Sequence, residues 1–252
     1  LIVTAEEHSI IGGLGSAVAE CLCSSVCVPL ETVGGHAGDV AALGEVHGGK
    51  IKIGQPTVLQ IFRPVGNMAA AVADAVAENG NLEITKKFTQ TAGTADVGTG
   101  TLTLGAASTV EGTVNAATIA NAELLTQNGG AITANNINGA FKQTAGAVNK
   151  QSGATLTFGS TVEQAQAEGK TAKIGSDSEN VTINGKLTQS EGTVVASTLT
   201  LKGGAEQTNA DKTKGVIEAG TLDLQNASAN VTLAQTGNKF GKVQGNADNI
   251  NI

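Results

Sequence analysis

The chain has 252 residues, a net charge of −7 at pH 7 and an isoelectric point near 5.0. This balance excludes the basic surface that binding to nucleic acid or to an anionic membrane requires. Aromatic residues make up only 2% of the chain, so Val, Leu, Ile and Ala must fill the interior. A mean hydropathy of +0.05 still permits a core.

Residue types are distributed unevenly along the chain. All Cys, Pro and His residues, the only Met and the only Arg lie at or before position 68. We therefore expect two regions of different character, 1–48 and 81–252, joined by a linker at 49–80. Because no signal-peptide pattern is recognisable at the start, we expect an internal piece of a longer protein. No apolar run has the length of a membrane span.

The first region is predicted to be a βαβ unit. Residues 1–4 and 26–33 are short apolar runs typical of buried strands, and residues 14–23 have the apolar spacing of a helix. Such a unit places its two strands in parallel with a right-handed crossover.

Three groups in this region have the residue types of functional sites. Glu6, Glu7 and His8 are an acid–base candidate, but consecutive residues at a strand end point to opposite sides. The "GGLG" stretch lacks the spacing of a phosphate-binding loop, so we expect a turn. The thiols form a C-x-C-x3-C pattern that a helix spreads over different faces, so we expect no metal site; they are Cys21, Cys23 and Cys27.

The motifs "IVTAEEHSIIGGLGSAVAE", "VPLETVG" and "HAGDVAAL" resemble the start of the C-terminal domain of the transketolase family over residues 2–48. The resemblance implies a non-catalytic domain, because that family holds thiamine diphosphate and its metal in domains further upstream. It also implies a cytosolic origin for this region, which its Cys content suits. A chimera of two unrelated proteins is an alternative interpretation.

The linker contains one apolar run at 57–62 and an Ala-rich stretch. Asn67 is a suitable N-cap and Asn79–Gly80 a suitable stop, which predicts a short helix over residues 68–78. In a stacked fold, such a helix can cap the open end.

Two phrases recur in residues 81–252. The first is apolar-x-Gln-x-x-Gly, and the second is an alternating strand such as "TLTLG" or "TLTFG". Alternation means that one face of each strand is buried. Examples of the first phrase are "FTQTAG" at Phe88, "LTQNGG" at Leu125, "FKQTAG" at Phe141 and "LTQSEG" at Leu187.

These repeats predict a mainly β fold, a right-handed parallel β-solenoid of roughly eight coils with about 20 residues each. Inward Val, Leu and Ile are expected to form continuous columns, and outward Thr to stack on Thr of the next coil. A β-sandwich or barrel is the competing fold, and it favours longer strands, Asn-Gly hairpins and more aromatic residues.

Few residues in 81–252 are of the types used for catalysis or metal binding. Asp177 and Glu179 in "GSDSEN" are candidates for contact with a cation, but the calcium-solenoid pattern is absent and a polar turn is expected. Asn180, Asn226 and Asn230 begin N-x-S/T sequons, which we interpret as turn residues. Ladders of Thr, Asn and Gln suit a glycan or ice, and equally a merely solvated face.

The stretches "LTQSEGTVVASTLTLKGG", "GVIEAGTLDLQNASANVTL" and "AQTGNKFGKVQGNADNINI" resemble passenger domains of bacterial autotransporters and filamentous-haemagglutinin-type adhesins. The resemblance implies an extracellular, cell-surface rod that is adhesive and not catalytic. Host surfaces, glycans and self-association are the expected contacts. No catalytic residue, cofactor or metal is expected. The alternative is a fragment of a thiamine diphosphate-dependent transferase subunit.

Overall fold

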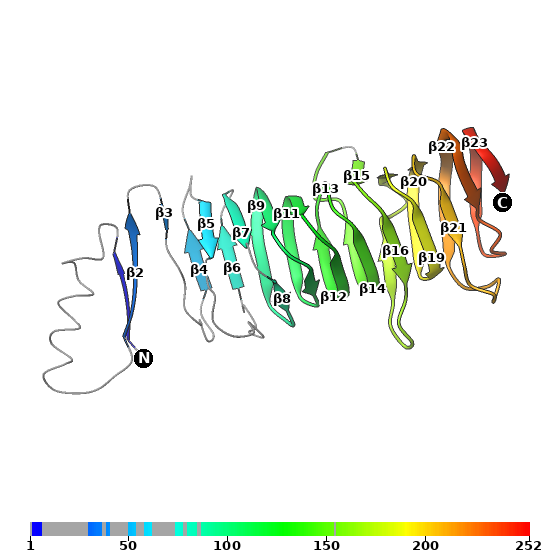
Figure 1. Cartoon of the computed structure of the whole chain (residues 1–252). Helices are drawn as coiled ribbons and strands as arrows, with labels where there is room; N and C mark the ends of the chain where they lie inside the picture. The colour runs from blue at the N-terminus through cyan, green and yellow to red at the C-terminus, as the bar shows by residue number, and fades with distance from the viewer. Residues whose placement is uncertain are drawn as a thin grey trace, which may run out of the picture.

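The computed structural model describes residues 80–84, 87–153 and 155–252 with their side chains. It also describes the backbone of six earlier strands. These are β1 (Ile2–Glu6), β2 (Leu30–His36), β3 (Asp39–Val40), β4 (Lys50–Ile53), β5 (Val58–Ile61) and β6 (Asp74–Ala77). Figure 1 shows the strands stacked side by side along an elongated molecule whose C-terminus lies at one end.

From residue 81 onward the chain is a succession of strands and turns. The strands are β7 (Asn81–Ile84), β8 (Thr89–Gln90), β9 (Thr94–Leu104), β10 (Ser108–Val110), β11 (Thr113–Asn121), β12 (Leu125–Thr133), β13 (Asn136–Ile137), β14 (Phe141–Asn149), β15 (Thr155–Phe158), β16 (Val162–Ala165), β17 (Ala172–Ile174), β18 (Asn180–Ile183), β19 (Leu187–Glu191), β20 (Thr193–Leu201), β21 (Ala205–Gln207), β22 (Val216–Thr232) and β23 (Lys239–Asn251).

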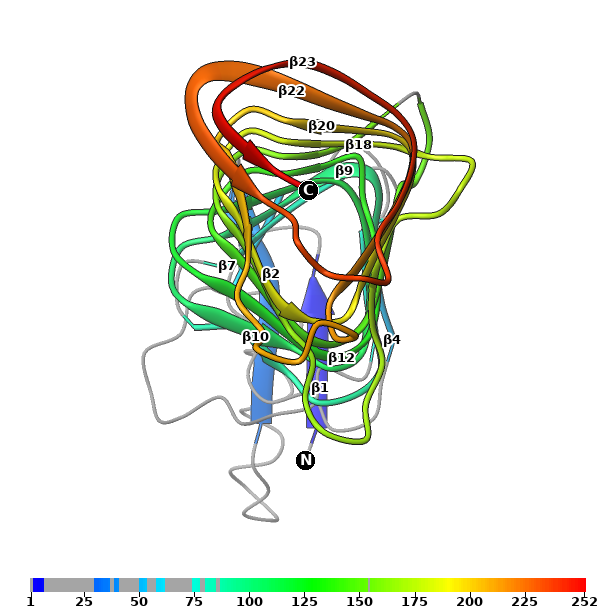
Figure 2. The ribbon, with the colours of Figure 1, turned by 90° about the vertical axis from the view of Figure 1, so that its right-hand side faces the viewer.

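The strands form a parallel β-solenoid of about eight turns over residues 82–251, which confirms the predicted mainly β solenoid and its number of coils. Each coil contributes to three parallel sheets, and Figure 2 shows the coils superposed around a common interior. The first sheet contains β8, β10, β16, β19, β21 and the starts of β12 and β14. The second contains β17, the ends of β12 and β14, and the starts of β9, β11, β20 and β22. The third contains β7, β13, β15, β18 and the ends of β9, β11 and β20.

The coils differ in length although their sheets stay in register. Leu125 pairs with Phe141, 16 residues later, whereas Ala205 pairs with Val231, 26 residues later. The predicted value of about 20 residues lies within this range. Extra residues are accommodated in turns between the sheets, where backbone groups reach solvent.

Alternation along the strands separates the core from the surface. The inward side chains are buried in one continuous apolar cluster, in which Phe141 and Phe158 lie with ring centroids 5.4 Å apart. Outward threonines pair in register on the third sheet, as Thr157, Thr182 and Thr200 do. Both features were predicted from the alternating phrases.

The recurring Gln-x-x-Gly phrase has an unexpected role, because its glutamines are buried. In a ladder of five buried glutamines, Nε2 of each member after Gln127 donates a hydrogen bond to Oε1 of the member in the preceding coil, over distances of 2.7–3.0 Å. Gln164 and Gln207 belong to this ladder although they lie outside the Gln-x-x-Gly phrase. The five members of this glutamine ladder are Gln127, Gln143, Gln164, Gln189 and Gln207. The amides also donate to backbone carbonyls at the corner that follows the first sheet, such as Gly146 O and Gly192 O. The ladder therefore satisfies polar groups inside an otherwise apolar interior.

The structure of residues 74–77 contradicts the helix predicted in the linker. The helix expected over 68–78 is wrong for Asp74–Ala77, which is a strand that pairs in parallel with β4 and with β9. Hydrogen bonds to a strand on each side outweigh the high helix propensity of alanine, because tertiary context overrides intrinsic propensity. The remainder of the expected helix lies outside the described residues. The boundary between linker and solenoid stays a prediction.

The first region agrees with its predicted strand pairing. β1 pairs with β2 in parallel, at bounds shifted by a few residues from the expected 1–4 and 26–33. The helix expected between them falls on residues that the structure does not describe.

Candidate functional site

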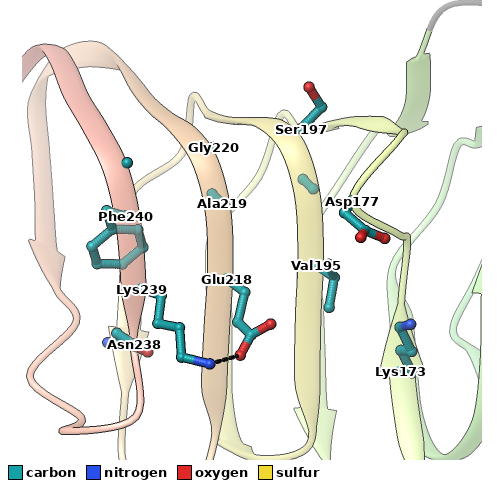
Figure 3. A pocket seen from close by; sticks show the side chains of 12 residues that line it. Lys173, Asp177, Val195, Ser197, Glu218, Ala219, Gly220, Asn238, Lys239 and Phe240 are labelled. Carbon is teal, nitrogen blue, oxygen red and sulfur yellow. Dashed lines mark hydrogen bonds and ion pairs between the residues drawn. The ribbon is translucent and has the colours of Figure 1, made fainter.

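A groove of about 870 Å³ crosses four neighbouring strands at the corner between the second and third sheets. Its walls come from β17, β20, β22, β23 and the turn after β17, so residues 68 positions apart in sequence share one surface (Figure 3). We call it the cross-coil groove. The side chains used below are Lys173, Asp177, Val195, Ser197, Glu218 and Lys239.

Strand register determines the floor of the groove. Val195 pairs with Glu218, and Glu218 pairs with Lys239, so these three side chains form one outward row. Small residues occupy the adjacent corner, at Ser197, Gly220 and Gly241. The absence of bulky side chains at that corner keeps the groove open.

The charges of the groove balance, with two cationic and two anionic side chains. Lys239 and Glu218 form an ion pair with a distance of 2.7 Å between Nζ and Oε1 (Figure 3). Lys173 and Asp177 make no side-chain hydrogen bond or ion pair with the described residues. The groove therefore offers one unpaired cationic donor and one unpaired anionic acceptor to a ligand.

The turn that carries "GSDSEN" separates the two acidic residues that the sequence singled out. Asp177 is exposed and lines the groove, whereas Glu179 is buried. Oε1 of Glu179 accepts a hydrogen bond from the backbone N of Lys150 at 3.3 Å, and Oε2 has no partner among the described residues. The two carboxylates thus face different surroundings, and the expected exposed polar turn is confirmed for Asp177 and not for Glu179.

The three sequon asparagines lie in different settings. Asn180 is the first residue of β18 and pairs with Thr155 and Thr198. Asn226 and Asn230 line a second hollow of about 670 Å³ beside Lys186 and Glu206. Oδ1 of Asn226 accepts from the backbone N of Ser228 at 3.0 Å, an Asx-type turn contact. The turn interpretation is wrong for all three asparagines, because Asn180 begins β18 and both Asn226 and Asn230 lie within β22.

Most candidate residues of the first region fall outside the part of the chain that the structure describes. Glu6 ends β1, and Glu7, His8 and the three Cys residues lie outside the described residues. Within the described part, no three His, Cys, Asp or Glu side chains are grouped to hold a metal ion. A helix long and apolar enough to cross a bilayer is not found in that part either.

Sequence inspection missed Lys173, Glu218 and Lys239 as groove residues. They come from three coils whose lengths differ, so no fixed spacing connects them. The pairing of strands in neighbouring coils brings these residues together. This pairing can be read from the sequence only after the alternating stretches around Val195 and Glu218 have been aligned with each other.

Comparison with protein-family models, curated proteins and solved structures finds no significant match to this chain.

Proposed function

We propose that this chain is a non-catalytic adhesive rod, part of a secreted passenger of the autotransporter type displayed on a bacterial surface. The observation that carries the proposal is the stack of parallel coils with a continuous core, because it makes an elongated, stiff body with long outward faces. The passenger-like phrases of residues 81–252 support the same conclusion. The coil sense is proposed to be right-handed, as in other parallel crossovers.

The cross-coil groove is the proposed contact site, and a neutral glycan is its proposed ligand. A sugar hydroxyl both donates and accepts hydrogen bonds. Neighbouring hydroxyls of one glycan can therefore accept from the Lys173 ammonium and donate to the Asp177 carboxylate. Balanced charge gives no preference for an anionic or cationic ligand. Such contacts are shallow, and repetition of rods on a surface raises the overall avidity.

Binding to an array of immobilised neutral and anionic glycans tests this function. We expect the purified chain to bind a subset of neutral glycans, and the double variant Lys173→Ala/Asp177→Ala to lose at least about tenfold in affinity. The matched control Lys202→Ala/Asp248→Ala removes exposed charges outside the groove and should bind as the unchanged chain does. Equal binding by both double variants would assign the contact to another face.

The transketolase-like alternative has one supporting observation, the parallel pairing of β1 with β2. It concerns residues 2–48 and implies a domain that works beside a separate cofactor-binding partner. Titration calorimetry with thiamine diphosphate and Mg²⁺ distinguishes the two. We expect no heat of binding for a surface rod, and saturable binding at micromolar concentration would favour the enzyme-related alternative.

A further inference from the structure

The outward face of the third sheet is polar and uncharged over six successive coils. One row of side chains crosses it in strand register, and its members are Thr101, Thr118, Asn136, Thr157, Thr182 and Thr200. A second row lies two residues earlier in three of these coils, and its members are Thr155, Asn180 and Thr198. We call these nine side chains the threonine face. The third-sheet segments that carry them contain no charged residue, and the longer row meets its first charge at Asp223 of the following coil.

The other two sheets differ from this face in charge. An outward row of the first sheet contains Lys142, Glu163 and Glu206, and the row on the second sheet contains Glu218 and Lys239. Charged side chains of both signs are the ordinary covering of a soluble surface. Because the threonine face lacks them, it suits a neutral ligand.

The hydroxyl groups of this face are free to bind outside the protein. Among the described residues, no side-chain hydrogen bond is made by the hydroxyls of Thr101, Thr155, Thr157, Thr182, Thr198 and Thr200. By contrast, Thr144 Oγ1 donates to Asn128 Oδ1 at 2.7 Å, and Thr236 Oγ1 donates to Lys212 O at 2.9 Å. All nine side chains of the face are partly exposed, so each free hydroxyl can both donate and accept a hydrogen bond there.

The geometry of the face favours an extended, periodic ligand. None of the nine side chains lines the cross-coil groove or the second hollow, whereas small molecules bind in concave sites. Neighbouring coils are about 4.8 Å apart, so the longer row spans about 24 Å over five intervals. Along a strand, side chains on one face repeat at about 6.8 Å. A surface that repeats in two directions at such short intervals matches a ligand that does the same.

We propose that the threonine face binds ice. Ice is a neutral, rigid array of water molecules with a repeat of similar length, and each water molecule both donates and accepts hydrogen bonds. Each threonine offers a hydroxyl to that array, while its methyl group excludes liquid water from the contact. The stacked coils hold these groups in place before binding, so little conformational entropy is lost. Many weak contacts made at once then give firm adsorption.

A crystalline polysaccharide is the other neutral, periodic surface to consider. Its sugar rings present apolar faces that stack on aromatic side chains, and the threonine face contains no aromatic residue. The composition of the face therefore favours ice.

Adsorption of the purified full chain to a slowly growing ice surface tests the proposal. We expect the chain to be enriched in the ice relative to a non-binding protein of similar size, and to suppress recrystallisation of fine-grained ice. Thr182→Lys places an ammonium group in the middle of the face. Because this group keeps its hydration shell, both activities should fall by at least about tenfold.

Thr188→Lys is the matched control. Thr188 lies on the outward row of the first sheet, between Glu163 and Glu206, and it is partly exposed as Thr182 is. This variant should adsorb to ice as the unchanged chain does, and circular dichroism should show the same β fold in both variants.

Four results would overturn the proposal. The first is an unmodified chain no more enriched in ice than the non-binding protein, and the second is an equal loss of adsorption in the two variants. Binding to microcrystalline cellulose or chitin that is lost in Thr182→Lys, without adsorption to ice, would assign the face to a polysaccharide. A dimer in sedimentation that Thr182→Lys dissociates, again without adsorption to ice, would assign the face to a second copy of the chain.

Discussion

Gln164 shows how a polar residue is retained inside an apolar interior. Its Nε2 donates to Gln143 Oε1 at 2.8 Å and to Thr193 O at 3.1 Å, while its Oε1 accepts from Gln189 Nε2 at 2.7 Å. Each contact spans coils, so a single side chain connects three of them. Because the ladder continues on both sides, removal of one member leaves two neighbours with incomplete hydrogen bonding.

We expect Gln164→Leu to lower the free energy of unfolding by about 1–3 kcal/mol, since buried polar groups lose their partners while the apolar volume is conserved. Urea denaturation at neutral pH measures this loss. Gln244→Leu is the matched control, because Gln244 is exposed, and it should change stability by less than about 0.5 kcal/mol. A similar small effect for both would show that the ladder contributes little.

Asp211 provides a pH-dependent contact in an exposed turn. Thr213 donates to its Oδ1 from the backbone N at 3.0 Å and from Oγ1 at 2.7 Å, and these bonds hold the pKa of Asp211 below its ordinary value, with Lys214 assisting. The turn is therefore stabilised at pH values above the ordinary carboxyl pKa, and this contribution is lost as pH falls through the lowered pKa.

An NMR titration of the Asp211 carboxyl carbon should give this lowered pKa. We expect Thr213→Val to raise the pKa by removing the side-chain donor, whereas Thr208→Val, at an exposed position without that contact, should leave it unchanged. An unaltered pKa in Thr213→Val would contradict the assigned cause.

At the scale of elements, the corners between sheets depend on particular glycines. Gly130 has φ of +60°, and a Cβ there would overlap the carbonyl oxygen of Gly112 in the preceding coil. Its neighbour Gly129 has no positive φ, and a Cβ there would lie 3.4 Å from the nearest atom. The two adjacent glycines thus differ sharply in what they tolerate.

We expect Gly130→Ala to destabilise the fold by at least about 1–2 kcal/mol, because left-handed strain adds to a backbone clash. Gly129→Ala should be close to neutral. Thermal unfolding of both variants provides the comparison, and equal melting temperatures would mean that the corner relaxes without cost.

Val110 interrupts the column of glutamines. It pairs with Gln90 on one side and Gln127 on the other, and Gln90 Oε1 has no partner among the described residues. Val162 is equally buried, but it pairs with Phe141 and Leu187 in an apolar column. A glutamine introduced at position 110 would therefore lie between two glutamines, whereas one introduced at position 162 would lie between two apolar side chains.

Val110→Gln should be tolerated to within about 1 kcal/mol, since its amide extends the ladder to Gln90, whereas Val162→Gln should cost about 1–3 kcal/mol or more for an unpaired buried amide. Chemical denaturation of both variants measures the difference. A larger loss of stability in Val110→Gln than in Val162→Gln would show that the side chains above and below a position do not decide whether glutamine is tolerated there.

For the whole molecule, the stack of residues 81–252 should fold without the first region. Within residues 81–252 the strands pair with strands of adjacent coils, so most of the core is independent of residues 1–48. A shortened chain of residues 81–252 is expected to give a β-rich circular dichroism spectrum and a cooperative melt. A random-coil spectrum would contradict this expectation.

The solenoid was predictable because its alternation is local: "TLTLG" specifies which side chains point inward without reference to other coils. The groove was not, since Val195, Glu218 and Lys239 meet only through cross-coil register. The glutamines were recognised as a repeated phrase, but their burial depends on neighbours that supply every hydrogen bond. The helix prediction was wrong at Asp74–Ala77 for the same reason, because strand partners on both sides override the local helix preference.

The ladder bonds all run in one sense along the rod, from Nε2 of a later coil to Oε1 of an earlier one. Amide dipoles of a few debye each, like those of peptide units, therefore add along the axis, with the negative end toward the C-terminus. Donors gather at that end: Asn238 Nδ2 lies 2.8 Å from Gln207 Oε1. A stack whose sheets repeat from coil to coil thus has an internal electrical polarity that distinguishes its two ends.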